Sequence, residues 1–434
     1  MRNFVAVASF GLMCVLGIGS QAYAGSTTAV PMKSHPIQPT NWSFECVASS
    51  TCGVNSLGVG TWITTTSQPG TVRLWDAGTS WSILQTGSST YNWTNLDAWL
   101  DLVAAHQPAA VIFTFGHVPC FISSVPCNSQ NQGESKYWSY GPPTDLNANG
   151  SETFTNFVTA LTTHCSAKGN CVKSYIKYWE MWNEPNLSHY WSGTVNQLYD
   201  MFKPVVPIIR ANVPGALIST PPICGGDTSY MASWLSLENT NGRLSDYYGF
   251  HAYLSGYEPE TRIDMIIRMV DTKNDAGWTS TPWMNTETNF EVTTDVCTSS
   301  VEDCDGQLVR WHVLQYAYQG GAGGAFHVGW YNWPSIKSGG YDTYYYTMMQ
   351  WLTGATFSAS CSSSGTVWTC PLTEASGATA LIVWNSAGSS SYTPATEYVD
   401  YREFNGTYGG ATKTISAGEA TTIGLIPIMF ETKP

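Results

Sequence analysis

Short runs of β-branched and aromatic residues alternate with longer amphipathic stretches from about Val54 to Met349. This alternation is typical of βα units, which build a parallel sheet. The predicted strands are Thr71–Trp75, Ala110–Phe115, Ile176–Trp182, Ala216–Thr220, Tyr248–Ala252, Trp283–Thr286 and Gly324–Val328. The predicted helices are Leu96–His106, Glu152–Cys165, Val195–Asn212, Arg262–Ala276 and Gln307–Gln319.

The first strand of this region is ambiguous, because two stretches fit it, Trp42–Cys46 and Gly58–Ile63. Either one brings the count to eight strands. Eight βα units in about 300 residues fit a (β/α)8 barrel. The predicted fold class is therefore α/β, with a (β/α)8 TIM barrel over residues 25–350.

The pattern changes after Trp351, where Ser, Thr, Gly and Val dominate and no helix is predicted. Alternating runs such as Ala378–Trp384 and Thr421–Pro427 are typical of short antiparallel strands. We therefore predict a small C-terminal β-sandwich domain over residues 351–434. Residues 26–45 are expected as a possible additional strand of this sandwich.

The first 24 residues have the pattern of an export signal. Arg2 precedes an apolar run from Phe4 to Gly19, and Ala22-Tyr23-Ala24 forms a small-x-small cleavage site. Residues 1–24 are therefore a predicted signal peptide, and the expected location is extracellular or periplasmic. No later apolar stretch approaches the ~20 residues that span a bilayer, so we expect no membrane insertion.

The cysteines fit an oxidising compartment. Of the 12 in the chain, 11 lie outside the predicted signal, and most of them form close pairs. The expected disulfides are Cys46–Cys52, Cys120–Cys127, Cys165–Cys171, Cys297–Cys304 and Cys361–Cys370, with Cys224 left unpaired. Zinc binding is the weaker alternative, because the pairs lack C-x2-C spacing.

Charge and composition limit the kinds of molecule that the protein is expected to bind. Charged residues make up 11% of the chain, against roughly 25% in soluble proteins, while hydrophobic residues make up 43%. The net charge of -13 argues against nucleic acid as a partner, because such proteins carry basic patches. The eight His are scattered and no H-E-x-x-H occurs, so we expect neither a metal nor another cofactor. We expect a monomer.

Two predicted strands end in a carboxylate. The run Trp182-Asn183-Glu184-Pro185-Asn186 closes one strand, and Asn285-Thr286-Glu287-Thr288 closes another. Glu184 and Glu287 are about three βα units apart, which assigns them to strands four and seven. Those strands face each other across the mouth of a barrel, at the end where active sites of this fold lie.

Paired carboxyl groups across a cleft are what glycoside hydrolysis requires. One group must be protonated to release the leaving oxygen, and the other must be ionised to attack or to activate water. At a separation of about 5–5.5 Å the second group bonds to the sugar directly, and the configuration is retained. Proximity also separates the two pKa values.

The chain resembles the clan A glycoside hydrolases, most closely family 39 and related bacterial proteins. The resemblance covers nearly the whole chain after residue 24. It rests on four motifs in the clan's order: Val72-Arg73-Leu74-Trp75-Asp76, Trp182-Asn183-Glu184-Pro185-Asn186, Phe250-His251-Ala252-Tyr253 and Asn285-Thr286-Glu287-Thr288. It implies a carbohydrate substrate, Glu184 as general acid/base, Glu287 as nucleophile, and Asn183 as the partner of the sugar 2-hydroxyl.

Other residues are candidates for substrate binding. Arg73 lies near a strand end and either holds Glu287 ionised or pairs with Glu180 inside the barrel. The remaining candidates are Trp75, His251, Tyr253 and Trp330. For His251 the alternative is a structural role in a loop, and for Trp330 it is an ordinary core aromatic.

A secreted retaining β-glycosidase is the leading hypothesis. The first alternative is a noncatalytic glycan-binding protein on a degenerate barrel, which has no need of two intact carboxylates. The second is a transglycosylase that remodels cell-surface polysaccharide. The Cys-rich loops at 120–127 and 297–304 follow predicted strands three and seven, so we expect both to border the mouth of the barrel.

Overall fold

The structure is a computed structural model of the chain. It describes residues 45–47, 71–75, 77–108, 110–127, 138–290, 301–318, 324–330, 342–352, 354–403 and 412–433. The predicted signal peptide, residues 26–44, the alternative strand Gly58–Ile63, and residues Cys52 and Cys297 lie outside the described residues.

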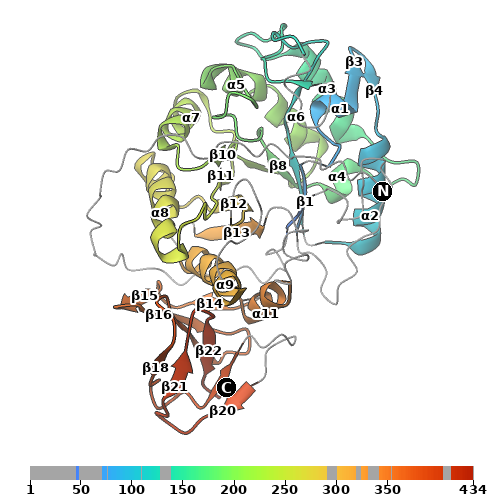
Figure 1. The fold of residues 1–434 in the computed structure, drawn as a ribbon. Helices are drawn as coiled ribbons and strands as arrows, with labels where there is room; N and C mark the ends of the chain where they lie inside the picture. Colours follow the sequence, from blue (N-terminus) through green and yellow to red (C-terminus); the bar gives the residue numbers. More distant parts are fainter. Residues whose placement is uncertain are drawn as a thin grey trace, which may run out of the picture.

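Two parallel sheets form the centre of the larger part of the molecule (Figure 1). Their orders are β1-β2-β5-β8-β9 and β10-β11-β12-β13, so neighbouring strands follow one another along the chain. An isolated parallel bridge between Ser219 and Tyr247 links the two sheets. The strands are β1 Glu45–Val47, β2 Thr71–Leu74, β5 Ala110–Thr114, β8 Tyr178–Glu180, β9 Leu217–Ser219, β10 Ile223–Cys224, β11 Tyr248–His251, β12 Trp283–Thr288 and β13 Ala325–Trp330.

These strands confirm the predicted βα alternation. β1 overlaps the first of the two candidates for the opening strand and pairs in parallel with β2. Glu45 therefore belongs to the parallel sheet and not to the C-terminal strands. Short antiparallel pairs were not expected: β3 Gln85–Gly87 with β4 Thr90–Tyr91, and β6 Val118–Pro119 with β7 Trp138–Ser139.

Helices surround the parallel sheets (Figure 1). They are α1 Trp81–Leu84, α2 Thr94–His106, α3 Glu152–Thr163, α4 Val172–Tyr175, α5 Val195–Phe202, α6 Val205–Asn212, α7 Thr228–Asn241, α8 Pro259–Asp275, α9 Val301–Ala317 and α11 Asp342–Leu352. The single helix predicted over Val195–Asn212 is two helices, because Pro204 interrupts the hydrogen-bond ladder. Among the described helices, none is long and apolar enough to cross a membrane.

Aromatic side chains fill the space between strands and helices. Trp81, Trp99, Trp179 and Trp283 are fully buried, and each large apolar side chain contributes about 1.5–3 kcal/mol through burial. A separate cluster consists of Ile112 of β5, Met284 of β12 and Tyr247, the residue before β11. Arg73 is as deeply buried as these side chains, and its partners define the candidate site.

The chain after α11 is antiparallel and contains no helix among its described residues, 354–403 and 412–433; we call this part the β region. Its strands are β14 Thr356–Phe357, β15 Ser362–Ser364, β16 Val367–Thr373, β17 Thr379–Asn385, β18 Ser390–Tyr392, β19 Asp400–Arg402, β20 Thr412–Thr414, β21 Thr421–Ile423 and β22 Ile428–Glu431. The main sheet has the order β14-β16-β17-β22-β19-β20, with β15 on β16, and β18 pairs with β21. Val383, Ile423 and Phe430 join the two sheets in one apolar cluster.

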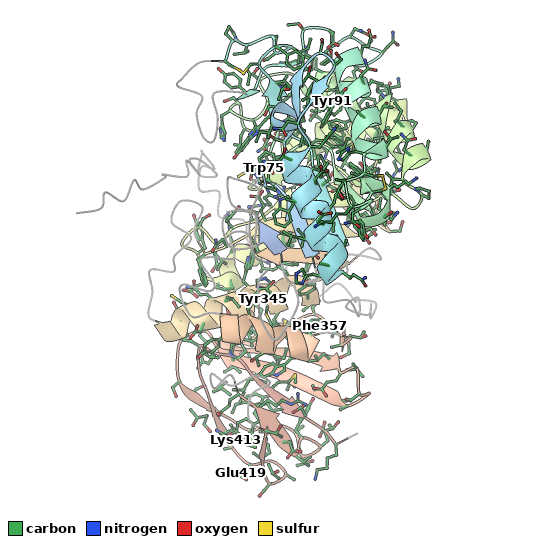
Figure 2. The ribbon with its side chains drawn as sticks, turned by 90° about the vertical axis from the view of Figure 1, so that its right-hand side faces the viewer. Trp75, Tyr91, Tyr345, Phe357, Lys413 and Glu419 are labelled. Carbon is green, nitrogen blue, oxygen red and sulfur yellow. A yellow bond between two sulfur atoms is a disulfide. The ribbon has the colours of Figure 1, made fainter. Side chains whose placement is uncertain are left out.

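Figure 2 shows the β region at one end of the molecule, with Lys413 and Glu419 at its far tip. Tyr345 of α11 and Phe357 of β14 lie at the junction with the α/β part, and both are buried. The β region therefore packs closely against the helices α9 and α11.

Three of the predicted disulfides are present: Cys120–Cys127, Cys165–Cys171 and Cys361–Cys370. Each closes a loop of fewer than ten residues, so these bonds fix loops. The prediction of an unpaired Cys224 is wrong. Cys224 is disulfide-bonded, as is Cys304, and the described residues contain no free cysteine. A long-range pairing cannot be inferred from sequence spacing, which is why the prediction failed.

Candidate active site

Six of the eight predicted site residues meet at the carboxyl ends of the parallel strands. They come from β2, from the segment after β8, from β11 and its following loop, and from β12: Arg73, Asn183, Glu184, His251, Tyr253 and Glu287. Trp75 lies two residues beyond Arg73 and is buried. Trp330 ends β13 opposite Thr288, and its side chain lies outside the described residues.

Arg73 is the centre of this cluster. Its guanidinium is fully buried and donates from Nε to Glu180 at 2.7 Å and from Nη1 to Glu287 at 2.5 Å. Thr114 donates a further hydrogen bond to Glu180 at 2.6 Å. Arg73 therefore pairs with both carboxylates named in the two alternatives, Glu180 and Glu287.

Glu287 is held through both of its oxygens. Oε1 accepts from Arg73, and Oε2 accepts from the Tyr253 hydroxyl at 2.7 Å. The side chain is almost fully buried. A neighbouring cation and hydrogen bonds to the charged form favour an ionised carboxylate.

A β-bulge in β12 directs Glu287 towards the site. Phe250 of β11 pairs with Asn285, but the next residue, His251, pairs with Glu287, so Thr286 is extra. Without the bulge, Thr286 and Glu287 would point to opposite faces of the sheet, because side chains alternate along a strand. The Thr286 hydroxyl instead lies 3.1 Å from Nε2 of His251, so both residues reach the same cluster.

Glu184 reaches the site through a distorted backbone. Trp182 has φ 82° and Glu184 has φ 43°, in the left-handed region that non-glycine residues seldom adopt. The amide of Glu184 donates to the carbonyl of Pro222 at 2.9 Å, which fixes the turn to the neighbouring strand. Such local strain persists only where surrounding contacts enforce it, and it is frequent at functional sites.

His251 connects the two carboxylates. Its Nδ1 lies 2.8 Å from Glu184 and 3.5 Å from Glu287. Burial first, and the charge of Arg73 second, hold the pKa of His251 well below its usual value, so the ring is neutral. Arg73 Nη2 lies 3.4 Å from Nε2 and is always a donor, which makes Nε2 the acceptor. We therefore assign the ring proton to Nδ1, from which it is donated to Glu184.

A side-chain oxygen of Glu184, one of Glu287 and a ring nitrogen of His251 lie within 4.8 Å of one another. Within the described part of the chain this is the one trio close enough to share a metal ion. The buried Arg73 already places a positive charge against Glu287, which opposes a second cation there. The arrangement therefore suits a pair of carboxyl groups that act on a substrate between them.

No family model matches the chain. A β-xylosidase of Geobacillus stearothermophilus is 25% identical over 170 residues, which are 38% of this chain and 31% of that protein. The chain thus spans about a third of the length of the curated relative that it matches.

Solved structures match over much more of the chain. A glucosidase from Croceicoccus marinus has a TM-score of 0.57 at 12% identity, covering 94% of this chain and 97% of its own. A monomeric β-xylosidase from Caulobacter crescentus has a TM-score of 0.56 at 13% identity, covering 94% and 98%. A glycoside hydrolase family 30 xylanase from Clostridium acetobutylicum has a TM-score of 0.56 at 14% identity, covering 94% of this chain and 98% of its own. The chain has the fold of clan A glycosidases.

The side-chain amide of Asn183 is oriented by Arg73. Its Oδ1 accepts from Arg73 Nη2 at 2.8 Å, which fixes the orientation of the amide because arginine only donates. Nδ2 is buried and has no hydrogen-bond partner within the described part of the chain. A buried donor without a partner is costly, so Nδ2 can donate to an acceptor that is placed beside it.

Two further rings beside Trp75 were not predicted. The ring centroid of His117 lies 4.9 Å from that of Trp75, and Tyr190 lies 5.8 Å from Trp75. Burial, assisted by His189, lowers the pKa of His117 to about 3, so it too is neutral. His117 has φ 61° and follows Gly116, where a Cβ would clash with the Trp75 ring. His117 lies three residues after the buried strand β5, at the carboxyl end of the parallel strands, where active sites of this fold lie. This position in the sequence could have identified His117 as a candidate.

Proposed function

We propose that the protein is a secreted glycoside hydrolase that cleaves β-glycosidic bonds with retention of configuration. The observation that carries this proposal is the placement of Glu184 and Glu287, with facing oxygens inside the 4.8 Å trio. Retaining enzymes hold the two carboxyl groups about 5–5.5 Å apart, whereas inverting enzymes need about 6.5–9.5 Å to admit a water. The separation of at most 4.8 Å between the nearest oxygens is shorter than the inverting range and supports retention.

In the first step, a Glu287 oxygen bonds to the anomeric carbon while the bond to the leaving oxygen breaks. Glu184 gives its proton to that oxygen, so charge is conserved. Arg73 and Tyr253 hold Glu287 ionised and oriented before the substrate arrives, which lowers the reorganisation needed in the transition state. Asn183 donates to the substrate hydroxyl beside the anomeric carbon.

In the second step, Glu184 takes a proton from water, and the water oxygen displaces Glu287 from the sugar. The neutral His251 supports both steps, because its Nδ1–H donates to a Glu184 oxygen and holds the carboxyl group in place. Once Glu287 is an ester its charge is gone, which favours the ionised form of Glu184 as the base.

We further propose that the two parallel sheets close into a (β/α)8 barrel. Counting β9 and β10 as one interrupted strand gives eight, and β1 lies next to β13. The barrel would cover residues 25–350, and the β region would form a sandwich over residues 351–434. The predicted signal peptide and the disulfides support secretion. Trp75 and Trp330 are proposed sugar-binding residues, and the protein is proposed to act as a monomer.

The proposed substrates follow from the similar proteins, which include xylosidases, a xylanase and a glucosidase. Aryl β-xylosides, aryl β-glucosides and xylan are therefore the first compounds to test. Proton NMR of the first product should show the β-anomer. An α-anomer as first product would exclude retention, and no turnover on any β-glycoside would support a glycan-binding protein instead. Longer products in the presence of an acceptor sugar would support a transglycosylase.

A further inference from the structure

The β region is bonded directly to the start of α8. Trp384 of β17 donates from Nε1 to Glu260 at 2.6 Å, and Glu260 lies in the first turn of that helix. Gly306 of α9 contacts the β region as well, since a Cβ there would clash with the carbonyl oxygen of Leu425. The position of α8 thus depends on a partner more than one hundred residues away along the chain.

A buried arginine fixes the same helix start from α9. Arg310 has no exposed side-chain surface, and it pairs with Glu260 at 3.1 Å, Glu258 at 3.2 Å and Asp303 at 2.9 Å. Glu258 is the residue that precedes α8. The first turn of α8 is therefore held by charge-assisted bonds from Arg310 and by the hydrogen bond from Trp384, and both residues donate to the same oxygen of Glu260.

The same helix start holds the loop that carries Tyr253. Arg262 donates from Nε to the carbonyl oxygen of Tyr253 at 2.7 Å, and its guanidinium lies 5.2 Å from the ring centroid of Tyr257. On the other side of the loop, the amide of Leu254 donates to the carbonyl of Asn289 at 3.0 Å. The Tyr253 backbone is thus fixed between α8 and the end of β12.

We infer that Arg262 is a positioning residue, which couples the docking of the β region on α8 to the hydrogen bond between Tyr253 and Glu287. The catalytic part of this inference rests on the proposed function. The coupling of the loop to the helix rests only on the contacts. The β region is, on this view, a working part of the catalytic unit and not a separate accessory domain.

The catalytic test compares Arg262→Met with Arg268→Met, a control that removes an exposed arginine from the same helix. Arg262→Met should lower kcat/KM about tenfold, because misplacing a positioned group is costly. The acid limb of the pH profile of kcat/KM should move to higher pH in this variant, because Glu287 loses a hydrogen-bond donor to its charged form. Arg262→Lys should restore part of the rate and part of the pH shift. When Tyr253→Phe is already present, Arg262→Met should cause no further loss of kcat/KM. If the two substitutions instead lower kcat/KM by independent factors that multiply, the inference is overturned.

The structural test needs no turnover. Hydrogen exchange of the amides in residues 254–257 should be faster in Arg262→Met than in the control, and moderately faster in Trp384→Phe. Trp368→Phe is the matched control, because Trp368 stacks on Trp384 with centroids 5.9 Å apart but has no bond to Glu260 in the structure. Unchanged exchange in both test variants would disprove the coupling. If the variants show these differences in exchange but the wild-type protein has no glycosidase turnover, only the proposed function would be contradicted.

Discussion

The ends of β8 and β12 bring their carboxylates to one point by different means and into different surroundings. Glu184 arrives through two residues with positive φ, and its partner is a neutral imidazole. Glu287 arrives through a bulge, and its partners are a guanidinium and a phenol. A carboxyl group beside a neutral donor can hold a proton more easily than one that pairs with a buried cation.

This asymmetry supports the two proposed roles without reference to any relative. In the proposed mechanism, Glu287 must be an anion and has the cation, whereas Glu184 must exchange a proton and has the neutral histidine. Separation of two like groups by their surroundings is the general way in which one site obtains both an acid and a nucleophile. Experiments on the contrast therefore test the proposed mechanism directly.

Replacing either carboxylate should have the largest effect. Glu184→Gln and Glu287→Gln should each reduce kcat/KM by on the order of a thousandfold or more while leaving the melting temperature near that of the wild type. Azide should separate the two roles. With an activated aryl glycoside it should rescue Glu184→Ala and give a retained glycosyl azide, whereas Glu287→Ala should give an inverted one. Identical products from both variants would contradict the assignment.

Removing the shared cation should come next in size. Arg73→Met leaves Glu180 and Glu287 buried without their partner, which should cost about 3–5 kcal/mol in the free energy of unfolding. Activity should also fall roughly a hundredfold. Urea unfolding and initial rates measure the two effects, with Arg268→Met as the surface control. A variant of normal stability would mean that Arg73 does not neutralise these carboxylates.

The neutral and charged sides of the site should differ in their response to the leaving group. His251→Gln mainly weakens the support of Glu184, whose oxygen lies nearer to the ring than that of Glu287. The value of kcat/KM should therefore fall about tenfold for poor leaving groups and little for dinitrophenyl glycosides. Tyr253→Phe weakens Glu287, so both classes of substrate should be affected alike. The same leaving-group dependence in both variants would remove the distinction between the two sides.

The buried neutral histidines should give the smallest and most general effect, on stability. Burial lowers the pKa of His312 to about 4, so below pH 6.5 the unfolded chain binds a proton that the folded chain does not. Folding stability is therefore lost as pH falls, by about 2 kcal/mol per such histidine between pH 6.5 and 5. Burial raises the pKa of Asp305 to about 6, which opposes this trend.

The difference between wild type and His312→Gln isolates the histidine, because Asp305 is common to both proteins. Urea unfolding at pH 6.5 and pH 5 should show a smaller loss of stability in the variant, by about 2 kcal/mol. Equal losses in the two proteins would show that His312 is protonated in the folded state.

Local sequence determined the strands, the order of the βα units and the positions of the two carboxylates at strand ends. It also determined the disulfides Cys120–Cys127, Cys165–Cys171 and Cys361–Cys370. These features depend on residues within a few positions of one another, where periodicity, turn residues and short loops act. The break at Pro204 was visible in the same local pattern but was missed.

Only the tertiary structure decided how the site is assembled. Arg73 meets Glu180 and Glu287, which are 107 and 214 residues away, and no local pattern chooses between such partners. The bulge at Thr286, the proton on Nδ1 of His251, and the place of His117 beside Trp75 each depend on neighbouring strands. Long-range packing sets these features, because a buried polar group takes its partner and its charge from whatever the fold places around it.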